Sequence, residues 1–306
     1  MSSLSVVVLS YNSLELLKQC VLNLLTLTNS PEIILVDNGS SDGSAEWIKS
    51  QTNSQLSSYI LDHNLGFAAG CNVGIRQSSG DYVLLLNTDA FLTSDSLNCL
   101  IRYLEIHPNV GIVGPQLLYA DGMWQRSSGA VPSVRSAILE ALGITSLHHL
   151  LLAWSWPITR NWWRPHEVGY VDGACMLIRR AVIDEIGLLD ESFFFFVEDA
   201  EFCHRAREHG WLTHYVPQSR VIHLRGGSSS QKDFQKSALM QLASRKLFIE
   251  RVYGNKSWKK LTFWGALNYW MRYHLCRVLA KNSAKCEKYQ FLNEIYWKEY
   301  LTSKAG

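Results

Sequence analysis

Three polar residues that could hold a cation follow a buried apolar run in the first third of the chain. Asn87-Thr88-Asp89 comes directly after residues 82–86, whose continuous apolar character is typical of a strand buried on both faces. In open α/β sheets, ligands bind just beyond the carboxyl ends of strands. A carboxylate and an amide at that position can bind a hard divalent cation, which can in turn bind a diphosphate. Taken alone, however, the tripeptide is more typical of an ordinary polar turn.

Two further polar turns follow apolar runs nearer the N-terminus. Ser10-Tyr11-Asn12 comes after residues 4–9, and Asp37-Asn38 comes after residues 33–36. An aromatic ring at one strand end and a carboxylate at the next could bind a nucleotide base, because the ring can stack on the base and the carboxylate can accept its imide N–H. Ordinary turn formation is the alternative for both segments.

A pair of carboxylates adjoins an apolar wall later in the chain. Four phenylalanines at 193–196 precede Glu198 and Asp199, near the expected start of a helix. Acidic residues are favoured in the first turn of a helix, so capping is one interpretation. An apolar wall can also raise the pKa of a carboxylate toward that of a general base, which is the interpretation that we favour. His223, which is followed by two glycines, is a further candidate ligand, although a lone histidine is more often structural.

The elements that must position these residues alternate regularly over the first part of the chain. Apolar periodicity predicts strands at 4–9, 33–36, 58–61, 81–86 and 111–114, and helices at 13–27, 45–49, 64–77 and 95–107. This alternation predicts a parallel, doubly wound sheet with the polar turns at one edge. Farther along, the pattern predicts strands at 168–178, 212–216 and 220–224, helices at 181–186 and 199–209, and mostly helix from 234 onward.

The composition excludes several classes of protein. The 306 residues include 47% hydrophobic and 18% charged residues, which is typical of a large globular domain or of a domain with an appendage. A net charge of +2 gives no support for nucleic-acid binding. We expect neither a signal peptide nor a membrane-spanning segment. The seven cysteines lack CxxC spacing, which indicates reduced thiols in a cytosolic protein and no zinc site.

In their order along the chain, these segments resemble the family 2 glycosyltransferases with the GT-A fold, and in particular the bacterial rhamnosyltransferase-like branch. The matching segments are SYN at 10–12, VDNGSSDGS at 36–44, NLGFAAGCNVGI at 64–75, GDYVLLLNTDA at 80–90, VDGACMLIRR at 171–180, GLLDESFF at 187–194, EDAEFCHR at 198–205 and HLRGGS at 223–228. Eight motifs in the same order make the resemblance specific.

The resemblance implies an α/β fold of the GT-A type, with a mostly parallel, doubly wound sheet and a helical C-terminal extension. The catalytic domain would span 1–230, with a nucleotide-sugar-binding half at about 1–115 and an acceptor half at about 116–230, and the helical segment would span 231–306. The implied activity is metal-dependent, inverting transfer of a sugar from a nucleoside diphosphate donor to a hydroxyl. The acceptor would be a glycan or a lipid-linked oligosaccharide of a bacterial polysaccharide pathway, and dTDP-rhamnose is the favoured donor.

Residue roles carry over by matching position. The implied contacts with the donor nucleotide or sugar are Tyr11, Asn12, Asp37, Asn38, Asn64, Gly66, Asn87, Asp172 and Asp190. Asp89 and His223 would bind Mg²⁺ or Mn²⁺, and Asp199 would be the catalytic base. Asn87 replaces the first Asp of the family's metal-binding motif, and Thr88 stands where the branch often has Pro, so the metal preference stays open.

Two other functions fit part of the pattern. A sugar-phosphate nucleotidyltransferase also uses a parallel sheet and acidic metal ligands, but it would need a Gly-rich, basic phosphate loop near the N-terminus, which residues 10–13 do not form. A sugar-nucleotide-binding relative without catalysis is the second alternative. The joint presence of Asp89, Asp199 and His223 argues against it.

Aromatic and basic residues interleave in the C-terminal part. Over 256–279 this mixture is typical of a helix that lies in a membrane interface. Packing of that helix on the catalytic domain and a homodimer contact are the alternatives. Residues 147–163, with four tryptophans, could form an acceptor-side loop at the same surface. We therefore expect a cytoplasmic protein, either free or peripheral on the inner face of the cytoplasmic membrane.

Overall fold

The computed structural model describes residues 3–28, 30–143, 164–224, 234–279 and 283–302. The chain forms two compact units, Met1–Ala130 with Asn161–Lys232 (unit 1) and Val131–Arg160 with Asp233–Gly306 (unit 2). Residues 131–143 therefore group with the C-terminal helices, whereas the sequence had suggested a boundary near 230. The tryptophan-rich stretch at 147–163 and the glycines after His223 lie outside the described residues.

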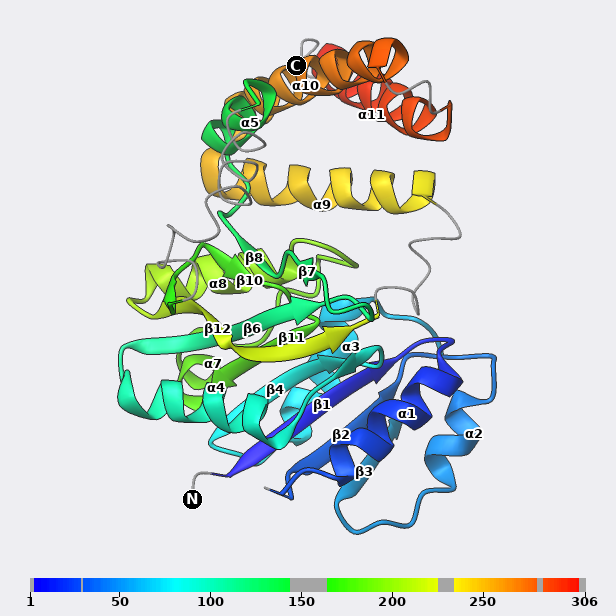
Figure 1. The fold of residues 1–306 in the computed structure, drawn as a ribbon, viewed down its shortest axis with the longest axis vertical. Coiled ribbons are helices and arrows are strands. Elements are labelled where there is room, and N and C mark those ends of the chain that lie inside the picture. The colour runs from blue at the N-terminus through cyan, green and yellow to red at the C-terminus, as the bar shows by residue number, and fades with distance from the viewer. Residues whose placement is uncertain (1–2, 29, 144–163, 225–233, 280–282, 303–306) are drawn as a thin grey trace. The chain divides into compact units, whose positions relative to one another are not determined.

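Unit 1 contains the alternating elements that the periodicity predicts (Figure 1). Its strands are β1 (Leu4–Ser10), β2 (Glu32–Asp37), β3 (Leu56–Ile60), β4 (Tyr82–Asn87), β5 (Ala90–Phe91), β6 (Val110–Leu118), β7 (Trp124–Gln125), β8 (Ser128–Gly129), β9 (His166–Glu167), β10 (Tyr170–Val171), β11 (Cys175–Arg179) and β12 (Leu212–His223). Its helices are α1 (Leu14–Leu25), α2 (Ser44–Lys49), α3 (Phe67–Gln77), α4 (Ser94–Ile106), α7 (Arg180–Ile186) and α8 (Glu198–Glu208).

The main sheet has the strand order β3-β2-β1-β4-β11-β6-β12-β5. Neighbours among β3, β2, β1 and β4 are parallel, and so are β6 and β12. Strand β11 runs antiparallel between β4 and β6, so the strands predicted at 81–86 and 111–114 are not neighbours. The sheet is mostly parallel, as predicted, but it contains a reversed strand that the alternation of elements did not indicate.

Three of the predicted strands are divided or joined in the structure. The segment predicted as one strand at 168–178 divides into β10 and β11, because Asp172 makes a turn by accepting the backbone N–H of Ala174 through Oδ1 at 3.0 Å. Conversely, the strands predicted at 212–216 and 220–224 join as β12. Strand β12 keeps its pairing with β6 through a register shift between Val216 and Arg220.

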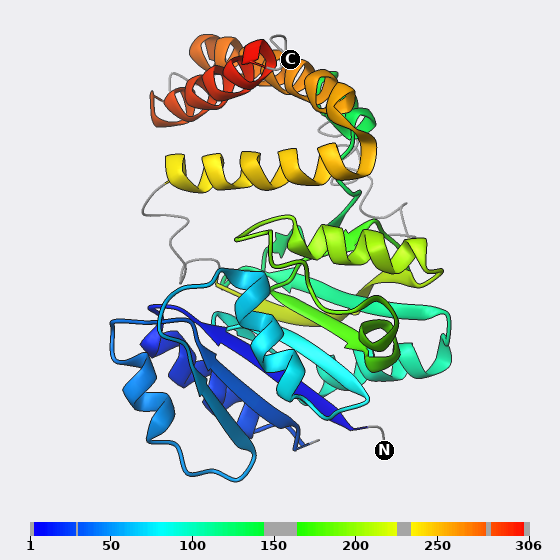
Figure 2. The same cartoon turned by 180° about the vertical axis from the view of Figure 1, so that it is seen from behind.

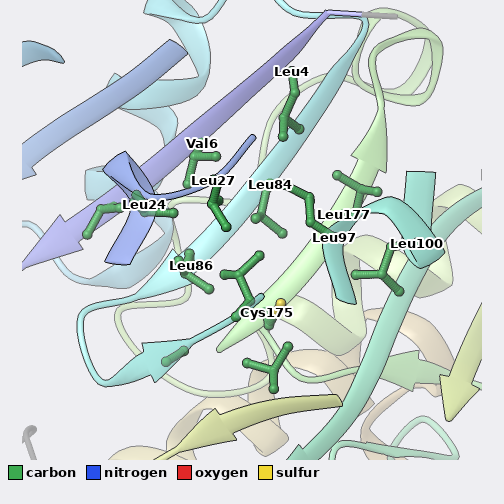
Figure 3. Packing of buried hydrophobic residues seen from close by; sticks show 14 of the residues in the cluster. Leu4, Val6, Leu24, Leu27, Leu84, Leu86, Leu97, Leu100, Cys175 and Leu177 are labelled. Atoms are coloured by element: carbon green, nitrogen blue, oxygen red, sulfur yellow. The ribbon is translucent and has the colours of Figure 1, made fainter. Parts of the chain in front are cut away.

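Helices cover both faces of this sheet, and alternate strand residues point to opposite faces. Val6 and Val8 of β1 pack in a cluster that includes side chains of α1, α2 and α4. Figure 3 shows part of this cluster, with Val6 near Leu24 of α1. Val7 instead packs with α3 and with the cluster that α7 and α8 complete. Figure 2 shows this second face, with α3 in front of the strands. Burial on both faces explains why the strands read as continuous apolar runs in the sequence.

The strand register places the polar turns at one edge of the sheet. Ser10 at the end of β1 is paired with Asp37 at the end of β2, and Leu9 is paired with Asn87 at the end of β4. The three strands are parallel, so their carboxyl ends lie together, as the sequence predicted.

Unit 2 is helical, with α5 (Val134–Ala141), α9 (Phe234–Tyr253), α10 (Asn255–Leu279) and α11 (Ser283–Thr302). Helix α10 contacts each of the other three and buries Trp258 and Ala266. Gly265 allows this packing, because a Cβ atom there would collide with the ring of Tyr296 on α11. Among the described helices, none has both the length and the apolar character needed to cross a bilayer.

Candidate active site

Asp89 and His223 meet although 133 residues separate them in the sequence. Strand β5 pairs antiparallel with the end of β12, which places His223 opposite Ala90, the residue after Asp89. The Nε2 atom of His223 lies 3.2 Å from Oδ1 of Asp89, and both side chains are buried. The resemblance implied that these two residues are metal ligands, and the fold brings them into contact.

Gln125 fixes the orientation of the histidine ring. Its Oε1 lies 2.6 Å from Nδ1 of His223, and its Nε2 donates to the backbone oxygen of His223 at 3.4 Å. The second bond orients the amide so that Oε1 is the acceptor, and the Nδ1 of His223 must therefore donate. In neutral His223 the other ring nitrogen, Nε2, then has a free lone pair that faces Asp89.

A carboxylate oxygen and an imidazole lone pair that face each other form a donor pair suited to a divalent cation. The hydrogen bond from Nδ1 to an amide oxygen is the kind of support that orients metal-binding histidines. The described residues contain no group of three or more His, Cys, Asp or Glu side chains that could hold a metal. Asp89 and His223 fit a cation that takes its remaining ligands from a bound phosphate or from water.

The edge formed by β1 and β2 offers a polar atom and a ring to a ligand. Asp37 is completely buried and accepts the N–H of Ser40 through Oδ2 at 2.9 Å, but its Oδ1 has no hydrogen-bond partner among the described residues. A buried carboxylate oxygen without a donor is costly unless a ligand supplies one. Tyr11 lies at the same edge with 43% of its surface exposed, so its ring is accessible for stacking.

Four other predicted contact residues have structural tasks at this edge. Asn38 donates to Oδ1 of Asn64 at 3.0 Å and to the backbone oxygen of Gly66 at 3.1 Å, and it accepts from the N–H of Leu65. Asn12, at φ 48°, accepts the N–H of the serine at position 41. The amide of Asn38 is thus occupied within the protein, and we interpret Asn12, Asn38, Asn64 and Gly66 as residues that shape the loops around a ligand.

Asp199 stands against the turn formed by residues 172–174. Its Oδ2 accepts the N–H of Gly173 at 3.2 Å, and its Oδ1 accepts the N–H of Ala200 at 2.7 Å. Removal of the carboxylate from water, together with the negative charge of Asp172, raises the pKa of Asp199 to about 7, although these two backbone N–H groups act in the opposite direction. The side chain is only partly buried, so it can reach a ligand.

Glu198 differs from its neighbour, because its side chain is buried and its Oε2 has no partner among the described residues. Burial, followed by the charge of Asp199, raises the pKa of Glu198 well above its usual value. The chain enters α8 through Phe196 and Val197 at φ 70° and 71°, which bulky and β-branched residues rarely adopt. Such strain persists where the surrounding structure holds it, and it clusters at functional sites.

Hydrogen bonds link these groups within unit 1. The N–H of Asn87 donates to the oxygen of Ala174 at 3.0 Å, which joins the end of β4 to the turn that holds Asp199. The N–H of Phe67 donates to the oxygen of Phe194 at 2.7 Å, which joins the Gly66 loop to the segment before α8. Asp190 instead binds locally, since its Oδ1 accepts both the N–H and the hydroxyl of Ser192.

Sequence reasoning missed Gln125 and gave no separate role to Glu198. Gln125 lies in a two-residue strand without a motif of its own, and only the pairing of β7 with β6 brings it toward His223. Glu198 was noted in the sequence, but only as a neighbour of Asp199. Its unpartnered oxygen is a property of the packed structure.

Known proteins share this fold and sequence pattern. The chain is 28% identical over 252 residues to the N-acetylglucosaminyl-diphospho-decaprenol L-rhamnosyltransferase of Mycobacterium tuberculosis, with 74% of this chain and 78% of the relative covered. It is also 28% identical to the low-salt glycan biosynthesis hexosyltransferase Agl10 of Haloferax volcanii, covering 68% of this chain and 62% of that protein.

Among solved structures, the mannosyltransferase PcManGT of Pyrobaculum calidifontis, in complex with GDP-Man and Mn²⁺, has a TM-score of 0.58 at 14% identity, with 98% of this chain and 87% of that chain covered. The likeness confirms the predicted GT-A fold. The curated relatives confirm the predicted resemblance to rhamnosyltransferases and support the assignment of the chain as a glycosyltransferase. The family model described as glycosyl transferase family 2 matches residues 5–187, which is more than half of the sequence, and the chain belongs to this family.

Proposed function

We propose that this glycosyltransferase is metal-dependent and inverting. It would transfer a sugar from a nucleoside diphosphate to an acceptor hydroxyl in bacterial polysaccharide or lipid-linked oligosaccharide synthesis. The observation that carries the proposal is the hydrogen bond between Asn87 and Ala174, because it links the strand end before Asp89 to the turn that holds Asp199. A site for the leaving diphosphate and a candidate base are thereby parts of one connected structure.

The donor nucleotide would bind at the ends of β1 and β2. The unpartnered Oδ1 of Asp37 can accept an N–H from the base, which would satisfy a buried oxygen that otherwise has no donor. The exposed ring of Tyr11 can stack on the same base. The resemblance to rhamnosyltransferases points to dTDP-rhamnose as the donor, and thymine presents the imide N–H that this arrangement requires.

Asp89 and His223 would hold Mg²⁺ or Mn²⁺, and a divalent cation bound there supplies positive charge to balance the negative charge of the departing nucleoside diphosphate. The protein's own contribution is orientation. Gln125 holds His223 in the tautomer whose Nε2 can bind the cation, and the β5–β12 pairing holds Asp89 beside it.

Asp199 would act as the general base. As the acceptor oxygen forms a bond to the anomeric carbon, the bond from that carbon to the diphosphate oxygen breaks, and the acceptor's proton moves to a carboxylate oxygen of Asp199. A base with a pKa near the working pH suits this transfer. A single displacement of this kind inverts the anomeric centre and requires no nucleophile from the enzyme.

A panel of nucleotide sugars tests the proposal. Binding and slow hydrolysis of dTDP-rhamnose, UDP-GlcNAc and GDP-mannose would be measured by calorimetry and by release of the nucleoside diphosphate, with Mn²⁺, with Mg²⁺ and after chelation. We expect at least one donor to bind and to be hydrolysed only when the metal is present. Metal-independent binding and hydrolysis of every donor that binds would contradict the proposed metal role, and failure of all nucleotide sugars to bind would contradict the proposed donor class.

A further inference from the structure

Helix α10 presents an apolar face that the described residues of unit 2 leave exposed. Trp270, Met271, Leu275 and Val278 are all exposed, with 48% of Trp270, 59% of Leu275 and 74% of Val278 accessible. At 100° per residue these four positions fall within an arc of about 140° on the helix surface. Phe263 lies in the same arc, but its ring packs against Trp297 and Tyr300 of α11. We refer to the four exposed side chains as the α10 face.

The packing of unit 2, within the residues that the structure describes, does not account for this face. The opposite side of the helix carries the buried residues Trp258, Leu261 and Cys276, which contact the remaining helices. The helix is therefore apolar on both sides, although only one side contributes to the core of unit 2. A surface helix of a globular protein usually has a polar outer side, so a second apolar side indicates an additional environment.

The charges around the α10 face are positive. Helix α10 contains five Lys and Arg residues and no Asp or Glu. Lys256 and Lys260 fall within the same arc as the apolar side chains, and Arg277 lies close to it. Residues 234–306 as a whole contain 14 of the 29 Lys and Arg residues but only 4 of the 27 Asp and Glu residues. The remainder of the chain is correspondingly acidic.

We propose that the α10 face binds the surface of a membrane that contains anionic lipids, with the helix lying in the plane of the interface. The apolar side chains would enter the boundary between headgroups and acyl chains, where tryptophan is favoured, and Lys256, Lys260 and Arg277 would meet the lipid phosphates. Spanning is not required, in keeping with the absence of a spanning helix among those described.

The charge favours lipid over a second copy of the chain. A symmetric dimer through the α10 face would place the same patch of both subunits in contact, and so would bring two sets of positive charges together. Like charges across an interface are unfavourable unless acidic partners separate them, and α10 has none. An anionic bilayer complements both the apolar and the basic parts of the face.

Co-sedimentation of the full chain with vesicles tests this inference without requiring the enzyme to turn over. We expect binding to vesicles of phosphatidylcholine mixed with phosphatidylglycerol, little binding to phosphatidylcholine alone, and a loss of binding as salt is added. Replacing Trp270 and Leu275 together by Ser should weaken binding about tenfold or more, because both side chains lose their apolar partner. Lys260→Gln with Arg277→Gln should weaken it about fivefold for each charge removed.

Matched controls lie in unit 1. Ile106→Ser removes an exposed apolar side chain at the end of α4, Lys49→Gln removes an exposed base on α2, and neither should change vesicle binding. Circular dichroism would show that each variant is folded. In a further variant, Trp270→Phe should bind but lose part of the fluorescence quenching by brominated lipids.

Equal binding of the Trp270/Leu275 variant and the native protein would overturn the inference. So would a dimer, seen by light scattering, that this variant converts to monomer without any effect on vesicles, because the face would then be a subunit interface. Failure of the proposed sugar transfer would leave vesicle binding unaffected, so the two proposals fail separately.

Discussion

Asp199 should limit sugar transfer at acidic pH. Its carboxylate must be ionised to accept the acceptor's proton, and burial and the charge of Asp172 raise its pKa to about 7. At pH 6 about one in eleven such groups is ionised, so kcat/KM should fall about tenfold below its plateau, and about a hundredfold at pH 5. An aspartate at its ordinary pKa of 3.8 would remain almost fully ionised at pH 6. The value of kcat/KM should therefore rise as the pH increases through the pKa of Asp199.

Asp172→Asn separates the two causes of the raised pKa. The amide oxygen of the variant can still accept the N–H of Ala174, so the turn is retained, but the negative charge beside Asp199 is lost. The midpoint of the kcat/KM profile should move to lower pH, and it should stay above the ordinary pKa of an aspartate because burial persists. Asp184→Asn, at an exposed position of α7, is the matched control and should leave the midpoint in place.

The assay is transfer of labelled sugar between pH 5 and 8.5, with circular dichroism to confirm that the protein stays folded. Loss of bound metal could also reduce activity in acid, so each profile is repeated at increasing Mn²⁺. Such a loss is reversed by added metal, whereas protonation of Asp199 is not. A flat profile across this range, or an unchanged midpoint in Asp172→Asn, would refute the reasoning.

Two more predictions concern neighbouring residues. Gln125→Leu should lower the affinity for Mn²⁺ about 10- to 100-fold in a binding titration, because His223 loses the acceptor that fixes its tautomer. Gln125→Glu keeps an acceptor and should retain binding. Equal affinities in the two variants would count against the role of Gln125 in orienting His223. Glu198 has a raised pKa, so the folded protein keeps the proton of this carboxyl group, while the unfolded chain releases it above the ordinary pKa of 4.5. The folded state therefore loses stability as the pH rises. In urea unfolding, the free energy of unfolding of Glu198→Gln should therefore rise relative to that of the native protein by about 1.4 kcal/mol per pH unit, until the pH passes the raised pKa. A difference in free energy that does not depend on pH would contradict the raised pKa of Glu198.

Local patterns in the sequence predicted much of the fold and the candidate site. The buried strands and the polar turns at their ends follow from composition over a few residues, and parallel pairing then places Asp37 and Asn87 at one edge. The resemblance implied that Asp89 and His223 bind the same metal. The pairing of β5 with β12 explains why these two distant residues are in contact.

Other features depend on tertiary contacts that no local pattern encodes. An apolar run such as β11 can run in either direction, so its reversed position between β4 and β6 was not predictable from periodicity. Gln125 acquires its importance from a partner 98 residues away. The unpartnered oxygens of Asp37 and Glu198 likewise arise only when the packed structure removes water from them.

One measurement on Asp199→Asn tests the central claim most directly. Sugar transfer and metal-dependent binding of the donor nucleotide would be measured on the same preparation of the variant. The asparagine can still accept the N–H of Gly173 or Ala200, but it cannot take a proton from the acceptor. We predict that transfer falls at least a hundredfold while donor binding stays within about twofold of the native value. Transfer at the native rate would contradict the assignment of Asp199 as the base.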